Sequence, residues 1–216
     1  MLLIQERQEI AHFGRKLLSA QLTTGSGGNL SIINRIQNLI AIKPSGIDYQ
    51  VMKPEDIVVV SPDGEIVQGS LKPSSEIHFH LRLYQARTDV HAILHTHQVY
   101  ATTLACLHWE LPAVHYLVGF SGDKVPLAPY ATYGAPELAE NIITAIGNYN
   151  ACLMANHGLV AVGRSLEAAF NTAEQIELAA HIFLLSKSVG APIILGENEM
   201  KIVIEKFKSY GQSSNR

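Results

Sequence analysis

The centre of the expected fold is the stretch VHAILHTH at residues 90–97. Its apolar run Ala92–Leu94 is rich in strand-forming residues and predicts a buried strand. Because side chains alternate across a strand, His95 and His97 lie on the same side, about 6.5–7 Å apart along the chain. Two imidazoles at that spacing can hold one metal ion, but a polar pair at a strand end explains the pattern equally well.

The segments on both sides of this stretch predict an α/β fold in one domain, residues 1–216. Apolar runs between turn residues predict strands, and apolar stripes at helical spacing predict helices. Their order suits an antiparallel or mixed sheet covered by helices, with strands and a loop mixed in 111–134. The expected helices are 3–20, 77–86, 98–107, 136–146, 165–189 and 198–209, and the other expected strands are 30–33, 39–42, 57–60, 65–68, 151–155 and 159–162.

Composition excludes several classes of protein. The 216 residues are 47% hydrophobic and 16% charged, which is typical of a globular protein with a large core. A net charge of −3 without a basic stretch predicts neither nucleic acid nor an anionic membrane surface as a partner. The charged N-terminus does not resemble a signal peptide, and no apolar run approaches a membrane span. Cys106 and Cys152 are expected to be buried thiols of a cytoplasmic protein.

A metal held by His95 and His97 needs further ligands, and two residues are candidates. His157 interrupts two apolar strands, where an unsatisfied polar group costs stability. Glu76 lies at the start of the expected helix 77–86. Three histidines and one carboxylate suit zinc or a similar divalent ion. His80 shares a helix face with Glu76 and is a rival partner, and every one of these residues also has an ordinary structural explanation.

Three short polar loops could bind an anion. The loop SGGN at 26–29 offers backbone amides without bulky side chains, and Ser45–Gly46 ends a strand in the same way. Ser74–Ser75 lies at a helix N-terminus, where free N–H groups and the helix dipole attract phosphate. None of these loops forms a Walker or dinucleotide-binding motif, and such loops are most often simple turns.

Five motifs occur together in the order of a known family. The motifs are GGNLS at 27–31, KPSG at 43–46, PSSE at 73–76, HTH at 95–97 and NHG at 156–158. In these motifs, and over nearly all its length, the chain resembles the class II aldolase/adducin family. Within the family it is most similar to members that cleave L-fuculose 1-phosphate. That similarity is carried by LPAVHY at 111–116, APYATYG at 128–134 and EKFKSYG at 205–211.

The resemblance implies a three-layer α/β/α fold with a mainly antiparallel central sheet. It also implies a homotetramer of fourfold symmetry with active sites between neighbouring subunits, and one Zn²⁺ per subunit. The implied zinc ligands are Glu76, His95, His97 and His157. The implied phosphate-binding residues are Gly28, Asn29, Ser45, Gly46, Ser74 and Ser75.

The reaction implied by the resemblance is the reversible cleavage of L-fuculose 1-phosphate to dihydroxyacetone phosphate and L-lactaldehyde. A divalent metal would stabilise the enediolate, so no Schiff-base lysine is needed. Glu76 would move the proton at the dihydroxyacetone phosphate carbon, and Tyr116 of an adjacent subunit would exchange one with the aldehyde oxygen. The aldehyde pocket would be walled by Tyr133, Phe207 and Tyr210, for which simple packing is the alternative.

Other activities remain open at this point. An L-ribulose-5-phosphate 4-epimerase would keep the fold and the metal, but that subfamily resembles a version with aspartate at position 76. Aldolases or dehydratases for other sugar phosphates are further alternatives. An adducin-like interaction module without catalysis would lack the metal. A Schiff-base aldolase is disfavoured because Lys43, Lys53 and Lys72 all stand beside prolines.

Overall fold

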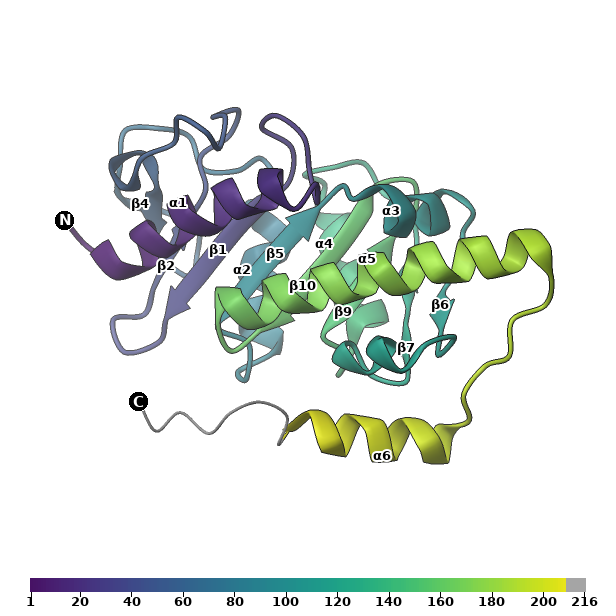
Figure 1. Ribbon diagram of the computed structural model, residues 1–216. Helices are drawn as coiled ribbons and strands as arrows, with labels where there is room; N and C mark the ends of the chain where they lie inside the picture. Colours follow the sequence, from purple (N-terminus) through teal and green to yellow (C-terminus); the bar gives the residue numbers. More distant parts are fainter. Residues whose placement is uncertain (209–216) are drawn as a thin grey trace, which may run out of the picture.

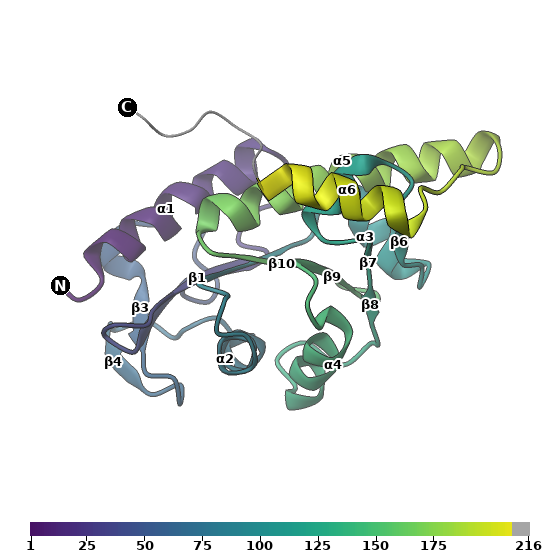
Figure 2. The same ribbon diagram turned by 90° about the horizontal axis from the view of Figure 1, so that it is seen from below.

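The computed structural model describes residues 1–208 and has three layers, with helices on both faces of one central sheet (Figures 1 and 2). The sheet order is β4-β3-β2-β1-β5-β10-β9-β8, and every neighbouring pair is antiparallel except β8 with β9. The strands are β1 (Asn29–Asn34), β2 (Leu39–Ile42), β3 (Val58–Val60), β4 (Ile66–Gln68), β5 (Ala92–Thr96), β8 (Leu127–Ala128), β9 (Ala151–Met154) and β10 (Gly158–Gly163). The predicted fold class is therefore confirmed.

Helices cover the sheet because its strands are apolar on both faces. In β5, Ala92 and Leu94 belong to one core and Ile93 to the other, as strand alternation requires. The first core packs under α1 (Ile4–Ser19), α3 (Val99–Cys106), α5 (Leu166–Val189) and α6 (Glu197–Lys208). The second packs under α2 (Ile77–Ala86) and α4 (Pro136–Ile146), which Figure 2 shows on the opposite side of the sheet.

The expected elements agree with the structure apart from shifts of one or two residues at their ends. The mixed segment 111–134 contains a small second sheet, formed by β6 (Leu111–Pro112) and β7 (Lys124–Val125), and the 3₁₀ helix η2 (Tyr116–Phe120). A second 3₁₀ helix, η1 (Pro54–Asp56), precedes β3. One expectation is wrong: Cys152 is buried, but Cys106 is exposed, because it is the last residue of α3 and faces away from the sheet core.

Close backbone contacts fix the strands on both sides of β5. Gly28, just before β1, has φ +70°, and a Cβ there would collide with the carbonyl oxygen of His95. A Cβ at Gly158, the first residue of β10, would collide with the carbonyl oxygen of Thr96. Glycine is needed at both positions because each neighbouring backbone lies against β5. The last residues of β5 are thus held tightly between two chain segments.

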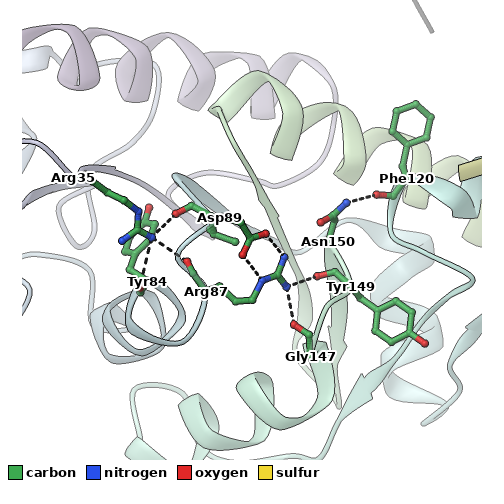
Figure 3. Close-up of polar contacts among 9 residues, drawn as sticks. Arg35, Tyr84, Arg87, Asp89, Phe120, Gly147, Tyr149 and Asn150 are labelled. Atoms are coloured by element: carbon green, nitrogen blue, oxygen red, sulfur yellow. Dashed lines mark hydrogen bonds and ion pairs between the residues drawn. The ribbon is translucent and has the colours of Figure 1, made fainter. Parts of the chain in front are cut away.

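Two arginines, Arg35 and Arg87, brace the opposite end of β5 by donating to backbone carbonyl oxygens (Figure 3). Arg87 also forms a bidentate ion pair with Asp89, at 2.7–2.8 Å. The Arg35 side chain donates to the backbone carbonyl oxygens of Tyr84, Arg87 and Val90. The Arg87 side chain donates to those of Gly147 and Tyr149. These bonds tie the turn before β5 to the turn after α4, so this cluster of charge is structural.

Among residues 1–208, no helix combines the length and the apolar character needed to cross a membrane.

Candidate metal centre and substrate pocket

The end of β5 brings three histidines together. The ligating ring nitrogens of His95, His97 and His157 all lie within 4.8 Å of one another. His95 Nδ1 lies 2.9 Å from the carbonyl oxygen of Leu159, so it carries the proton and donates it to that oxygen. The other nitrogen, Nε2, therefore faces the cluster, 3.0 Å from His97 Nε2. The three histidines therefore lie close enough together to share one metal ion.

Glu76 completes this cluster from the start of α2, on the face of the sheet to which His95 points. It is the residue before α2, and its buried carboxylate places Oε2 3.3 Å from His95 Nε2 and Oε1 3.5 Å from His157 Nε2. Asn29 Nδ2 donates to Oε2 at 3.0 Å, whereas Oε1 is buried without a hydrogen-bond partner. Such an atom normally costs stability, so its position calls for a cation.

The four side chains fit a divalent metal ion. Ring nitrogens facing one another at 3.0 Å repel unless a proton or a cation lies between them. Three imidazole nitrogens with one carboxylate oxygen form a donor set that suits zinc, and four such ligands are typical of its sites. The bond from His95 Nδ1 to Leu159 is also the outer contact that usually orients a metal-bound histidine.

In the metal-free state, the protonation of the cluster is set by burial and by mutual charge. Burial raises the pKa of Glu76, but the imidazoles of His95, His157 and His80 outweigh this and lower it to about 2. For His95, burial lowers the pKa, and the adjacent Glu76 carboxylate reverses the effect and raises it. Burial, followed by the proximity of His95, lowers the pKa of His97 and His157 to about 4. A charged Glu76 therefore faces neutral imidazoles at His97 and His157 and favours the protonated form of His95.

The three predicted anion loops surround one cavity of about 380 Å³. An isolated bridge between Pro44 and Pro73 holds two of them together, through bonds from Ser45 N to Lys72 O and from Ser74 N to Lys43 O, each 3.0 Å. The cavity is lined by Ser26, Gly27, Gly28, Asn29, Lys43, Ser45, Gly46, Ser74, Ser75, Glu76, His97, Tyr133 and His157. The anion loops and the histidine cluster therefore share one pocket.

Lys43 is a pocket residue that the sequence interpretation missed. Its side chain is buried, and Nζ donates to the carbonyl oxygens of Ser26 at 3.1 Å and Pro44 at 3.3 Å. Burial lowers the pKa of Lys43 to about 8, despite the opposing effect of Asp48. A cation held among three anion loops favours a phosphate. A lysine at the end of an apolar strand, directly before one of these loops, was the signal available in the sequence.

The predicted aromatic wall is divided between two places. Tyr133 lines the metal pocket, and the next residue, Gly134 at φ +76°, lies so close to Ser75 that a Cβ there would come within 2.9 Å of the Ser75 carbonyl oxygen. Tyr116 and Phe207 instead line a separate cavity of about 470 Å³, with ring centroids 6.1 Å apart. Figure 1 shows α6, which carries Phe207, at the lower edge, whereas β5 ends at the upper edge. Tyr210 lies outside the described residues.

His80, the rival ligand, does not join the histidine cluster. It is fully buried, and its Nε2 lies 2.5 Å from Asn29 Oδ1. Its other nitrogen, Nδ1, lies 2.7 Å from Ser31 Oγ. Both ring nitrogens are therefore already used within the protein. His78, two residues earlier, is exposed.

Comparison with known proteins agrees with this geometry. Residues 8–184 match the family model described as Class II Aldolase and Adducin N-terminal domain. The chain is 49% identical over 212 residues to 5-deoxy-D-ribulose 1-phosphate aldolase of Bacillus thuringiensis serovar kurstaki, covering 98% of this chain and 100% of that protein. It is 38% identical over 192 residues to L-fuculose phosphate aldolase of Escherichia coli strain K12, covering 88% of each.

The chain is also similar to a protein of known structure. An L-fuculose 1-phosphate aldolase has a TM-score of 0.93 and 46% sequence identity, with 94% of this chain and 96% of that chain covered. Similarity to aldolases over almost the whole chain defines an enzyme, a lyase of the metal-dependent type. The chain belongs to the class II aldolase and adducin family.

Proposed function

We propose that this enzyme cleaves a ketose 1-phosphate between C3 and C4, releasing dihydroxyacetone phosphate and a short aldehyde. One observation carries the proposal. The floor of the pocket holds the buried carboxylate of Glu76 among three histidines, and its walls are the anion loops with Lys43. A phosphate and a reacting carbonyl can therefore be bound at the same time.

The phosphate half of the substrate would be held by backbone and hydroxyl donors. Gly28 and Asn29 supply one loop, Ser45 and Gly46 a second, and Ser74 and Ser75 the N-terminal side of α2, where the helix dipole adds attraction. The Lys43 cation neutralises part of the phosphate charge from within the wall. This binding would place the adjacent carbons over Glu76.

Glu76 is suited to move the proton at the dihydroxyacetone phosphate carbon. His95, His97, His157 and Glu76 would hold a zinc ion, which supplies a Lewis acid that stabilises the negative charge left when the carbon–carbon bond breaks. Asn29 donates to Glu76 Oε2 and leaves Oε1 without a hydrogen bond, 3.5 Å from His157 Nε2. Burial raises the pKa of a carboxylate and nearby positive charge lowers it, so a carboxylate in a partly dry pocket becomes a stronger base when no cation is paired with it.

The aldehyde half would meet residues of a neighbouring subunit. Tyr116 and Phe207 are together but line a cavity separate from the metal pocket of their own chain. We propose a homotetramer in which both reach the pocket of the next subunit. Tyr116, exposed in the single chain, would then exchange the proton with the aldehyde oxygen, and Tyr133, Phe207 and Tyr210 would wall the aldehyde.

Two substrates are the leading candidates, L-fuculose 1-phosphate and 5-deoxy-D-ribulose 1-phosphate. The first would give L-lactaldehyde and the second acetaldehyde, so both products end in a methyl group. The fuculose enzyme is supported by the structural similarity at 46% identity, and the deoxyribulose enzyme by the 49% match over the whole chain. Both substrates contain the dihydroxyacetone phosphate half, which the pocket formed by the metal centre and the anion loops would hold.

The test is a product assay with the zinc-loaded protein and a panel of sugar phosphates, including both candidates and L-ribulose 5-phosphate. Dihydroxyacetone phosphate and the aldehyde are measured separately. We expect retro-aldol cleavage that EDTA abolishes and zinc restores, and that falls strongly in Glu76→Gln. Activity after complete metal removal would contradict the mechanism, as would undiminished turnover in Glu76→Gln. Conversion of L-ribulose 5-phosphate without release of dihydroxyacetone phosphate would favour the epimerase.

A further inference from the structure

A continuous row of buried polar side chains runs beneath the metal pocket, from α2 through β1 to Glu76. Tyr84 Oη and His80 Nδ1 each lie 2.7 Å from Ser31 Oγ. His80 Nε2 contacts Asn29 Oδ1, and Asn29 Nδ2 donates to Glu76 Oε2 at 3.0 Å. Tyr84, Ser31, His80 and Asn29 are each no more than 3% exposed.

Chemistry fixes the direction of every bond in this row. The Glu76 carboxylate can only accept, so the Asn29 amide must present Nδ2 to it and Oδ1 to His80. His80 must then carry its proton on Nε2, which leaves Nδ1 as an acceptor. Ser31 must donate to Nδ1, and its remaining lone pair accepts from the Tyr84 hydroxyl.

We propose that Tyr84, Ser31 and His80 form a positioning relay that fixes the orientation of the Asn29 amide and, through it, the carboxylate of Glu76. The relay rests on the proposed function only in that Glu76 is the carboxylate of the metal centre. Without a defined His80 tautomer, the Asn29 amide could turn over and aim Oδ1 at the carboxylate, which would repel it. No residue of the relay needs to touch the substrate or the metal.

The surroundings support a neutral, directional relay. Burial lowers the pKa of His80 to about 3, although nearby Glu76 opposes this. The His80 ring stacks on Phe79 at 4.3 Å, and Phe79 packs edge-on against His95 at 5.9 Å, so the ring cannot easily turn. Burial also raises the pKa of Tyr84, so its hydroxyl remains a donor. Buried polar groups stabilise a fold only when they are satisfied, and every side-chain polar atom of Tyr84, Ser31, His80 and Asn29 has a partner.

The tautomer of His80 is the first test. Zinc-loaded protein with ¹⁵N-labelled histidine is studied by NMR, and the His80 signals are assigned by their loss in His80→Gln. We expect a proton on Nε2 and none on Nδ1. A proton on Nδ1 would overturn the proposal. In Ser31→Ala we expect a mixture of tautomers, whereas an unchanged tautomer in that variant would show that Ser31 does not direct the relay.

Zinc affinity is the second test, measured by competition with a chromophoric chelator and therefore independent of any sugar phosphate. Loss of residues that orient metal ligands weakens binding by about 10–100-fold, and we expect about tenfold for Ser31→Ala. His80→Gln keeps one donor and one acceptor and should retain affinity. His80→Met fills similar space without polar atoms and should lose it. Equal affinities in His80→Gln and His80→Met would refute the relay, and exposed His78→Gln is the matched control.

Turnover separates the relay from simple packing and from the proposed reaction. If the protein cleaves a ketose 1-phosphate, Ser31→Ala should lower kcat more than it raises KM, because the orientation of Glu76 is disturbed while Lys43 and the serine loops remain. A purely structural role would lower the melting temperature and leave kcat unchanged. If the substrate panel shows no cleavage but the tautomer and zinc results hold, the proposed reaction fails and the relay stands.

Discussion

Acidification should destabilise the zinc-free protein strongly below pH 6.5, because two histidines near the metal centre, His80 and His157, remain neutral in the folded state. Burial lowers the pKa of His80 to about 3, and burial together with the proximity of His95 lowers that of His157 to about 4. In the unfolded chain a histidine binds its proton near pH 6.5. Between about pH 6.5 and 4 the unfolded state therefore holds more protons, and the free energy of unfolding falls as the pH falls.

The expected magnitude is large. One pKa unit corresponds to about 1.4 kcal/mol, so each of these two histidines removes about 3 kcal/mol between pH 6.5 and 4. Together they remove about 6 kcal/mol, which is comparable to the lower part of the roughly 5–15 kcal/mol that stabilises a typical domain. His97 adds less because it is more open to solvent than His80 and His157, and solvent screens its charge. His95, whose pKa is raised, is protonated in both states and adds nothing in this window.

The assay is urea unfolding of EDTA-treated protein at a series of pH values, followed by far-UV circular dichroism. The slope of unfolding free energy against pH should reach about 2.7 kcal/mol per pH unit, and His157→Gln should halve it. Exposed His78→Gln should leave the slope unchanged. Zinc at 100 times its dissociation constant should add about 2.7 kcal/mol at neutral pH. A flat profile, or an unaltered slope in His157→Gln, would refute the reasoning.

Three further predictions concern the anion loops and the subunit boundary. Affinity for inorganic phosphate, measured by calorimetry, should fall above about pH 8 because Lys43 loses its proton there. Lys43→Met should abolish this pH dependence, and an identical profile in the variant would show that Lys43 is not part of the anion site. Gly28→Ala should lower the free energy of unfolding in urea by roughly 1–3 kcal/mol, and by more than Gly46→Ala, because only a Cβ at Gly28 would meet backbone atoms. Equal losses of stability in the two variants would count against the close contact between Gly28 and β5. Inactive Glu76→Gln and Tyr116→Phe proteins should regain activity when their subunits are exchanged, and no recovery would place both residues in one chain's site.

Much of the fold could be predicted because local sequence patterns determined it. Strand alternation placed His95 and His97 on one side of the chain at the end of β5, and the expected strands 57–60 and 65–68 correspond to β3 and β4. The two-faced apolar strands required helices on both sides. The convergence of Glu76 and His157 on that strand followed from family resemblance rather than from any spacing.

Features that depend on contacts between distant segments could not be predicted. Ser31, His80 and Tyr84 look like ordinary polar residues until β1 and α2 are packed together. Lys43 was judged by its neighbouring proline, yet the pairing of Pro44 with Pro73 turns its side chain into the pocket wall. Cys106 was expected to be buried from composition alone, which carries no information on the face of a helix.

The pairing of β1 with β5 fixes the distance between the anion loop at 26–29 and the histidine cluster. Asn29 lies opposite His95 in that pairing, and Gly28 packs on the same strand, so the anion loop and the histidines cannot move apart. A substrate bound at both would have to keep the same spacing between its phosphate and its carbonyl. Changes of substrate in related enzymes should therefore occur at the aldehyde end, which Tyr133 and residues of the next subunit would meet in the proposed tetramer. For synthesis, this means that new aldehydes are a more accessible target for engineering than replacements for dihydroxyacetone phosphate.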